Sequence, residues 1–286
     1  MAKVIVRIKG GLGNQLFCYA AARRLALANK AELVIDDVTG FVRDTQYRRK
    51  YMLDKFSITA RKATPAERLE PFERYRRGLA MFLSRRKPFG QRPYLEQEGL
   101  DFDRRLLDLK VSGSLYLDGY WHSEDYFKDV EERLREDLRI IPPTDEQNLR
   151  LGAEIVSGPS VALHVRSFAA GDSSATLGAE YYNRALEYAE AKLGKPRYFL
   201  FSEEPEAALA RLALPEGRVT VVSHNKGDGA ACSDLWLMSK CSHFIIANST
   251  FSWWGAWLSN APWKIVVAPK SGFANEDIIP ERWIKL

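Results

Sequence analysis

The chain is poor in cysteine and has no long apolar run, and both absences exclude classes of protein. Its 286 residues include only three cysteines, Cys18, Cys232 and Cys241. They are too few and too scattered for a disulfide framework, so a reducing cytoplasm is the expected compartment. No apolar stretch approaches the ~20 residues that span a bilayer. Residues 1–10 have the pattern of a strand rather than that of a signal peptide.

Residue sets for metal binding and for serine hydrolysis are also absent from the sequence. Cys241 and His243 are two candidate ligands without a second pair at the spacing of a zinc site. Neither a Gly-x-Ser-x-Gly sequence nor a Ser-His-Asp arrangement is present. We therefore expect a protein that works without a metal or another cofactor.

Composition and length indicate a globular protein of one large domain or two average ones. Hydrophobic residues make up 46% of the chain and charged residues 28%, as in soluble proteins. The sequence Ile-Pro-Pro-Thr-Asp at 141–145 predicts a boundary, because proline disfavours helix at its own position and at the residue before it. We expect two domains, residues 1–142 and residues 143–286.

Strand-like and helix-like segments alternate in both halves. The first half has expected strands at 3–8, 32–35 and 115–117, with helices at about 14–28 and 123–138. In the second half, expected strands at 161–165, 198–201, 219–222, 244–247 and 265–267 alternate with helices near 180–193, 205–213, 232–239 and 252–259. This alternation predicts an α/β protein whose two Rossmann-like halves, each a parallel sheet covered by helices, face a cleft.

Residues 43–92 form a basic insertion of helical or loop-like character in the first half. Fifteen Lys and Arg stand against five Asp and Glu, so this segment carries +10 and the rest of the chain −5. Peripheral contact with an anionic membrane is one expected role. A solvated basic face beside the active cleft is the alternative. No nucleic-acid motif accompanies the segment, so no nucleic-acid partner is expected.

A glycine-rich turn follows the first strand. Its sequence from Gly11 through Gly13 and Asn14 nearly fits a dinucleotide fingerprint, but Leu16 replaces the third glycine, which allows close packing of helix on strand. An NAD(P)-dependent oxidoreductase therefore becomes a distant alternative. The glycines still indicate a backbone that a ligand approaches closely, or simply a tight turn with packing glycines.

An anion site is predicted where the strand at 244–247 runs into a helix. Asn248, Ser249 and Thr250 can cap the helix start through their side-chain oxygens. The remaining N–H groups and the helix dipole favour a bound phosphate at the same place. An ordinary capped core helix is the alternative interpretation. Trp253, Trp254 and Trp257 have the spacing of core aromatics, which favours packing over sugar stacking.

Polar side chains also end two other strands of the second half. His164 and Arg166 occupy alternate positions, so they point to one face, and an arginine there suits a diphosphate. Ser202 and Glu203 end the next strand, where acids can bind a sugar or base edge or favour a helix start. Asp234 can likewise contact a base edge or lie in solvent. A structural histidine and a surface arginine are the alternative for the first pair.

These segments, in this order, resemble the bacterial α-1,2-fucosyltransferases of glycosyltransferase family 11. The resemblance lies in residues 10–21, 119–121, 126–127, 164–166, 181–182, 201–204 and 234–254. It implies a GT-B fold, with an acceptor-binding first domain and a GDP-sugar-binding second domain. It also implies a diphosphate contact for Arg166, an approach of Asn14 to the sugar and β-phosphate, and donor binding by Gly11, Gly13, His164, Ser202, Glu203, Asp234, Asn248, Ser249, Thr250 and Phe251.

The sequence departs from the family at one place. The family usually has His-x-Arg-Arg-Gly-Asp, whereas Ser167 here replaces the second arginine and three residues precede Gly171-Asp172. Loss of a cation beside the leaving group is expected to weaken donor binding or to change the donor to another GDP-6-deoxyhexose. The related protein O-fucosyltransferases carry asparagine at this position, so one arginine can suffice.

The reaction implied by the resemblance is an inverting, metal-independent transfer of L-fucose from GDP-β-L-fucose to a sugar 2-hydroxyl. The expected acceptor is a surface glycan such as an O-antigen or capsule repeat, lipid-linked at the cytoplasmic leaflet. Candidates for the base that accepts the hydroxyl proton are Asp36, Asp37, Asp118, Glu124 and a donor phosphate oxygen. A non-catalytic glycan-binding module is the alternative outside enzymes.

Overall fold

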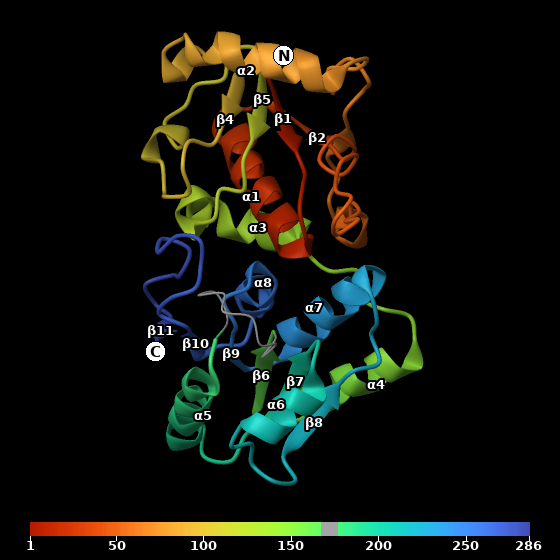
Figure 1. Ribbon diagram of the computed structural model, residues 1–286, viewed down its shortest axis with the longest axis vertical. Coiled ribbons are helices and arrows are strands. Elements are labelled where there is room, and N and C mark those ends of the chain that lie inside the picture. The colour runs from red at the N-terminus through yellow and green to blue at the C-terminus, as the bar shows by residue number, and fades with distance from the viewer. Residues whose placement is uncertain (167–176) are drawn as a thin grey trace. The chain divides into compact units, whose positions relative to one another are not determined.

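The computed structural model describes residues 1–166 and 177–286, and the chain folds into two compact units (Figure 1). Unit 1 is Met1–Arg139 and unit 2 is Ile140–Leu286. The division lies just before the Pro-Pro sequence from which a boundary at residues 142 and 143 was expected. Each unit is built on one parallel sheet, as the alternation of strand and helix predicted.

Unit 1 is a five-stranded sheet with helices on both faces. Its elements are β1 (Lys3–Arg7), α1 (Leu12–Ala28), β2 (Glu32–Asp36), η1 (Leu53–Lys55), β3 (Arg61–Lys62), α2 (Glu73–Arg85), η2 (Phe89–Gln91), β4 (Tyr94–Glu96), η3 (Arg104–Leu106), β5 (Ser114–Asp118), η4 (Glu124–Tyr126), η5 (Lys128–Val130) and α3 (Glu131–Asp137). The strand order is β3-β2-β1-β5-β4. Ile5 faces the cluster on which Met81 of α2 packs, and its strand neighbours Val4 and Val6 point to the opposite face.

Unit 2 is a six-stranded parallel sheet. Its elements are α4 (Glu146–Ile155), β6 (Ser160–Val165), α5 (Ala179–Leu193), β7 (Arg197–Ser202), α6 (Pro205–Arg211), β8 (Val219–Val222), η6 (Asp228–Ala230), α7 (Ala231–Lys240), β9 (His243–Ile245), α8 (Thr250–Leu258), β10 (Val266–Ala268) and β11 (Ile284–Lys285). The strand order is β11-β10-β9-β6-β7-β8. The near-continuous apolar run of β6 is buried along most of its length, as expected of a central parallel strand.

In both sheets the order of the strands reverses beside the first strand of the unit. In unit 1 the chain leaves β1 for β2 on one side, while β5 lies on the other. In unit 2, β7 and β8 follow on one side of β6, and β9, β10 and β11 lie on the other. Ligands of such sheets bind outside the carboxyl ends of the strands at this switch. The topology therefore points to the residues that follow β1 and β5 in unit 1 and β6 and β9 in unit 2.

The helix expected at 123–138 is wrong in its first half. The chain there forms η4 and η5, and only α3 is α-helical. Tyr126 and Phe127 are both fully buried, and the backbone at Phe127 has a φ of −148°, which no α-helix accommodates. Anchoring of two consecutive aromatic side chains thus overrides local helix preference. Within the described residues, no helix is long and apolar enough to cross a membrane.

Candidate active site

The switch point of unit 2 brings together His164, at the end of β6, and the start of α8. His164 Nδ1 lies 2.8 Å from the Ser252 hydroxyl, and its ring centroid lies 5.9 Å from that of Phe251. This contact follows from the sheet, because β6 pairs directly with β9, from which the chain enters α8. Burial and the nearby Arg166 guanidinium lower the pKa of His164 to about 4. The imidazole is therefore neutral at physiological pH.

The start of α8 is held by a local cap and by its tryptophans. Ser249 is the N-cap, and its hydroxyl accepts from the Phe251 N–H at 3.3 Å. Asn248 anchors the preceding turn by donating to the Gly272 carbonyl at 3.0 Å. Trp253, Trp254 and Trp257 are completely buried, which confirms packing as their role. Sequence capping signals thus located the helix start correctly.

Arg166 is exposed directly after β6. Its backbone and its charge oppose the rise that burial causes in the pKa of Tyr182 on α5, so Arg166 lies close to that hydroxyl. Within the described residues, no acidic side chain forms an ion pair with this guanidinium. Val165 pairs with Ser202, so the end of β7 lies beside Arg166. The substitution at Ser167 and the Gly171-Asp172 pair fall outside the described residues.

Ser202 and Glu203, at the end of β7, have a more local role than His164 and Arg166. The Ser202 hydroxyl accepts from the Glu204 N–H at 3.0 Å, which turns the chain into α6. The Glu203 side chain is exposed. Both residues thus lie at the carboxyl end of β7, with the Ser202 hydroxyl engaged in a turn and the Glu203 carboxylate facing solvent.

Asp234 on α7 belongs to a polar network that the sequence did not reveal. Asn225 donates to its carboxylate at 2.8 Å and to the Asn148 side-chain oxygen at 3.0 Å. His224 also contacts Asn148, at 3.0 Å, and the Asp145 carboxylate accepts from the Asn148 side chain at 2.9 Å. Burial raises the pKa of Asp234 to about 6, against the opposing hydrogen bond from Asn225. A desolvated carboxylate of this kind marks a candidate binding position.

The glycine turn of unit 1 lies at the switch point of its sheet. Gly10 has a φ of +76°, and Asn14 in the first turn of α1 contacts His122 at 3.1 Å between Oδ1 and Nε2. The ring of Tyr120 stacks on His122 at 5.1 Å between centroids. Burial, with a smaller contribution from Lys9, lowers the pKa of His122 to about 4. Sequence reasoning missed His122, although it follows directly after the Gly-Tyr-Trp sequence.

Gln15, in the first turn of α1, has a structural role. Its side chain is completely buried. Its Nε2 donates to the carbonyls of Gly10 at 2.9 Å and Lys50 at 2.8 Å, and its Oε1 accepts from the Met52 N–H at 2.9 Å. Both N–H groups and the oxygen of the amide therefore form hydrogen bonds within the protein. Gln15 thus fastens the basic insertion to the glycine turn.

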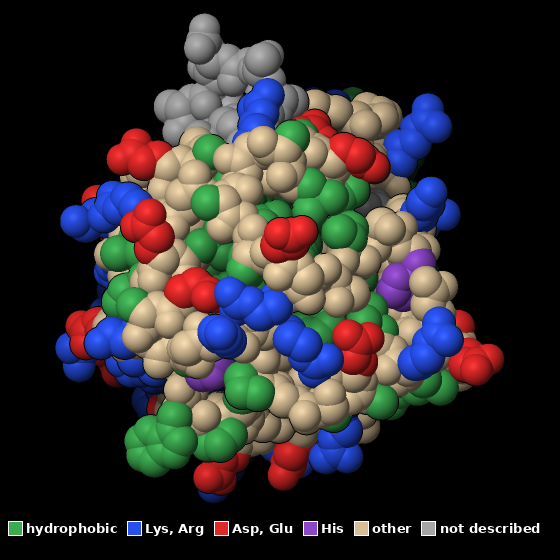
Figure 2. Space-filling model, turned by 90° about the horizontal axis from the view of Figure 1, so that it is seen from below, with side chains coloured by type: hydrophobic (Ala, Val, Ile, Leu, Met, Phe, Trp, Pro, Cys, Tyr) green, Lys and Arg blue, Asp and Glu red, His purple; other side chains and the backbone are tan. Residues whose placement is uncertain are grey.

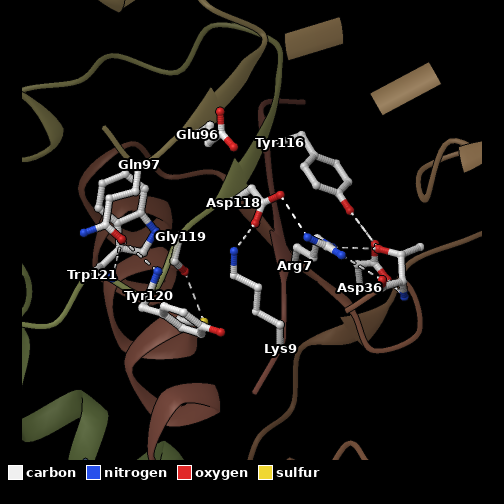
Figure 3. A network of polar contacts seen from close by, with 12 residues as sticks. Arg7, Lys9, Asp36, Glu96, Gln97, Tyr116, Asp118, Gly119, Tyr120 and Trp121 are labelled. Carbon is white, nitrogen blue, oxygen red and sulfur yellow. Dashed lines mark hydrogen bonds and ion pairs between the residues drawn. The ribbon is translucent and has the colours of Figure 1, made fainter. Parts of the chain in front are cut away.

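Asp118, a candidate base, lies in a dense charged network at the end of β5 (Figure 3). Its carboxylate accepts from Lys9 at 2.7 Å, from Arg7 at 3.2 Å and from the Tyr94 hydroxyl at 2.6 Å. Burial would raise the pKa of Asp118, but the charges of Lys9 and Arg7 outweigh it and hold the pKa below its usual value. The carboxylate is therefore a weak proton acceptor.

The other candidate bases, Asp36, Asp37 and Glu124, differ in their burial and in their contacts with the protein. Asp36 is fully buried and accepts from the Thr39 N–H at 2.9 Å, from the Thr39 hydroxyl at 2.6 Å and from the Tyr116 hydroxyl. Asp37 lies 3.6 Å from Lys62. Glu124 is buried in η4. Across residues 1–166 and 177–286, no three His, Cys, Asp or Glu side chains are grouped to hold a metal ion.

The fold is that of the GT-B glycosyltransferases, with two parallel sheets flanked by helices. The crystal structure of the α-1,6-fucosyltransferase NodZ soaked with GDP-fucose aligns with 90% of this chain and 92% of its own, at a TM-score of 0.51 and 18% identity. Another NodZ structure, from Bradyrhizobium, aligns with a TM-score of 0.50. At this level of identity the likeness concerns the fold.

Residues 3–286 match the profile of Glycosyl transferase family 11, and the chain belongs to this family. The α-1,2-colitosyltransferase of Escherichia coli is 28% identical over 310 residues, which cover 100% of this chain and 99% of the relative. The O-antigen biosynthesis glycosyltransferase WbnK of Escherichia coli is 28% identical over 309 residues, covering 98% and 99%. The resemblance noted in the sequence is thereby confirmed, and the oxidoreductase alternative loses its basis.

Proposed function

We propose that the protein is an inverting glycosyltransferase that moves L-fucose from GDP-β-L-fucose to the 2-hydroxyl of a sugar in a surface glycan, forming an α-1,2 linkage. One observation carries the proposal: an exposed arginine and the capped start of a buried helix meet at the switch point of one sheet. Arg166 follows β6, and Ser249 and Thr250 follow the neighbouring strand β9. Both provide positive potential for the same diphosphate.

Charge stabilisation is the main catalytic contribution we assign to these residues. Breaking the bond between sugar and phosphate leaves negative charge on GDP and positive charge on the anomeric carbon. Arg166 and the N–H groups at the start of α8 stabilise the GDP charge from fixed positions. In this proposal they do the work that a divalent metal does in other transferases. Asn14, next to His122, is assigned to the sugar and β-phosphate, and Gly11 and Gly13 allow close approach of the ligand.

The proton of the acceptor hydroxyl needs a base, and the contacts narrow the choice. Asp118 and Asp36 have their lone pairs occupied by buried donors, so neither is a good acceptor. Asp37, Glu124 and a phosphate oxygen of the donor remain. Activity of Asp37→Asn and Glu124→Gln within about threefold of the parent would assign the proton to the donor phosphate.

The identity of the donor sugar is tested separately from the reaction class. Colitose, the sugar that the name of the α-1,2-colitosyltransferase relative contains, is the second candidate for the transferred sugar. We test the two by measuring GDP release from GDP-fucose and from GDP-colitose, with and without a galactoside acceptor, in the presence of EDTA. Acceptor-dependent release from GDP-fucose and an α-1,2 linkage in the product are expected. Release from neither sugar nucleotide, or complete loss of activity in EDTA, would refute the proposal.

Asp234 is assigned to guanine, whose N1–H and 2-amino groups suit a carboxylate. Because its pKa of about 6 is raised, its protonated form stabilises the fold at low pH, and that stabilisation is lost as the pH rises through 6. GDP needs the ionised form, so its affinity should fall about tenfold per unit below pH 6. Titration calorimetry from pH 5 to 8 tests this.

Asp234→Asn provides the matched variant for that titration. The amide is neutral throughout, so GDP binding should be weaker and should change with pH only through the terminal phosphate of GDP, while unfolding above pH 6 should require more free energy than in the parent. Glu216→Gln, an exposed carboxyl on the same unit, is the control. A parent whose GDP affinity is flat between pH 5 and 8 would remove Asp234 from the guanine site.

A further inference from the structure

Helix α2 in the basic insertion exposes an apolar ridge to solvent. The ridge consists of Phe72, Tyr75, Leu79, Phe82 and Leu83, whose exposed fractions are 72%, 75%, 58%, 54% and 48%. These are large side chains, and the charged residues Glu73, Arg74 and Arg76 lie among the first of them in the sequence. A contiguous exposed apolar surface on a soluble domain marks a site of interaction.

The ridge is not a misplaced core face, because α2 already packs on its sheet through other residues. Ala80 and Met81 pack on the cluster of unit 1 that contains Ile5. Ser84 is buried, and its hydroxyl accepts from the Tyr94 N–H at 3.1 Å, which ties the helix to β4. By helical spacing these residues lie on the side opposite the ridge. The helix therefore has two apolar faces, and only one is covered by the described residues.

Positive charge surrounds the ridge. Residues 72–87 contain six Lys and Arg and a single acidic residue, Glu73. The Arg86 guanidinium lies 4.1 Å from the centre of the Phe82 ring, with its charge at the margin of the apolar surface. On the face of the molecule drawn in Figure 2, by contrast, Lys and Arg are interspersed with Asp and Glu. The charge excess is thus concentrated in the insertion.

A basic pocket lies on the side of α2 opposite the ridge. The pocket has a volume of about 350 Å³ and is lined by Arg7, Thr39, Val42, Arg43, Glu73, Arg74, Arg77, Gly78 and Met81. Arg7 is already paired with Asp118, so three guanidinium groups, those of Arg43, Arg74 and Arg77, oppose the carboxylate of Glu73 in the lining. Arginine forks of this kind suit phosphate groups. The pocket therefore does not face the same surface as the ridge, whose own neighbours Arg76 and Arg86 supply the cations beside it.

We propose that the ridge of α2 docks on an anionic membrane surface, with its aromatic and leucine side chains in the interface and the surrounding arginines on lipid phosphates. An amphipathic basic helix with aromatic residues on its apolar side lies in the membrane plane in this way. The docking site is separate from the residues assigned to the transfer reaction. It would hold the enzyme where a lipid-linked acceptor is displayed.

Sedimentation of the full chain with vesicles tests the docking. We expect binding to phosphatidylcholine vesicles that contain phosphatidylglycerol, little binding to phosphatidylcholine alone, and loss of binding at high salt. Tyr75→Ser/Leu79→Ser/Phe82→Ser should weaken binding at least ~10-fold. Leu149→Ser/Leu209→Ser/Trp263→Ser, which removes three exposed apolar side chains from unit 2, should bind as the parent does.

Three results would overturn the proposal. In the first, the parent chain does not bind the anionic vesicles. In the second, the ridge variant binds them as well as the parent does, so that electrostatic adsorption alone explains the binding. In the third, the parent forms a dimer that the ridge variant does not, and neither chain binds vesicles, so that a second copy covers the ridge. Circular dichroism and GDP binding of each variant report folding independently of the vesicles.

Discussion

Replacing Arg166 with alanine is expected to lower turnover of the GDP-sugar at least about 100-fold. The guanidinium is exposed at the switch point of unit 2 and is permanently charged. Its proposed partner, the leaving diphosphate, gains charge in the transition state, so the loss should appear in kcat as well as in kcat/KM. Initial rates of GDP release with saturating acceptor measure it.

Two further variants sharpen the interpretation of this result. Arg166→Lys keeps the charge but not the planar fork, so an intermediate loss would indicate two-point contact with the diphosphate. Arg150→Ala removes an exposed arginine on α4 and serves as the control. If folded Arg166→Ala loses less than about threefold in turnover, the leaving-group role must be given to another residue.

Replacing Asp118 with asparagine is expected to lower the free energy of unfolding by about 3–5 kcal/mol. The carboxylate neutralises Lys9 and Arg7 together and is almost completely buried. Asparagine keeps the shape but leaves two cations without a counter-charge in a low-dielectric site. Chemical denaturation monitored by tryptophan fluorescence provides the measurement.

The pH dependence gives this prediction an independent check. Because the pKa of Asp118 is lowered in the folded protein, its stabilisation is present above its unfolded value of about 4 and is lost as the pH falls through the folded value. The difference between parent and Asp118→Asn should therefore shrink in acid. Asp108→Asn, at an exposed position, should change stability by less than about 0.5 kcal/mol. A loss at Asp118 as small as this would show that the network contributes little.

Local pattern was sufficient to predict most of the sheet framework. Buried runs such as that of β6 have no competing helical periodicity, and the helices between them have clear ends. The two-residue strands β3 and β11 carry no pattern of their own, since their pairing depends on the strand beside them. Helix α4 follows the Pro-Pro sequence, where the boundary obscured the capping signal of Asp145.

The candidate site also contains two kinds of residue: those with a local sequence signal, and those whose contacts join positions distant in the sequence. Ser249 could be predicted because a helix cap depends on adjacent residues. His164 and Arg166 could be predicted because they lie at the end of a strand. Asn225 and Asn148 are 77 positions apart, and no local rule connects them to Asp234. His122 is 108 positions from Asn14. Such contacts arise only when the sheet has formed.

The tryptophans of α8 have a consequence for how the donor is received. Trp253 donates from its indole nitrogen to the Ile278 carbonyl at 2.7 Å, and its ring stacks on that of Trp257. A nine-residue helix that is held by these contacts is not expected to tilt or unwind when a nucleotide binds. Its dipole is therefore oriented before a ligand arrives, and if GDP binds at this helix as proposed, ordering of the helix should contribute only a small entropy penalty.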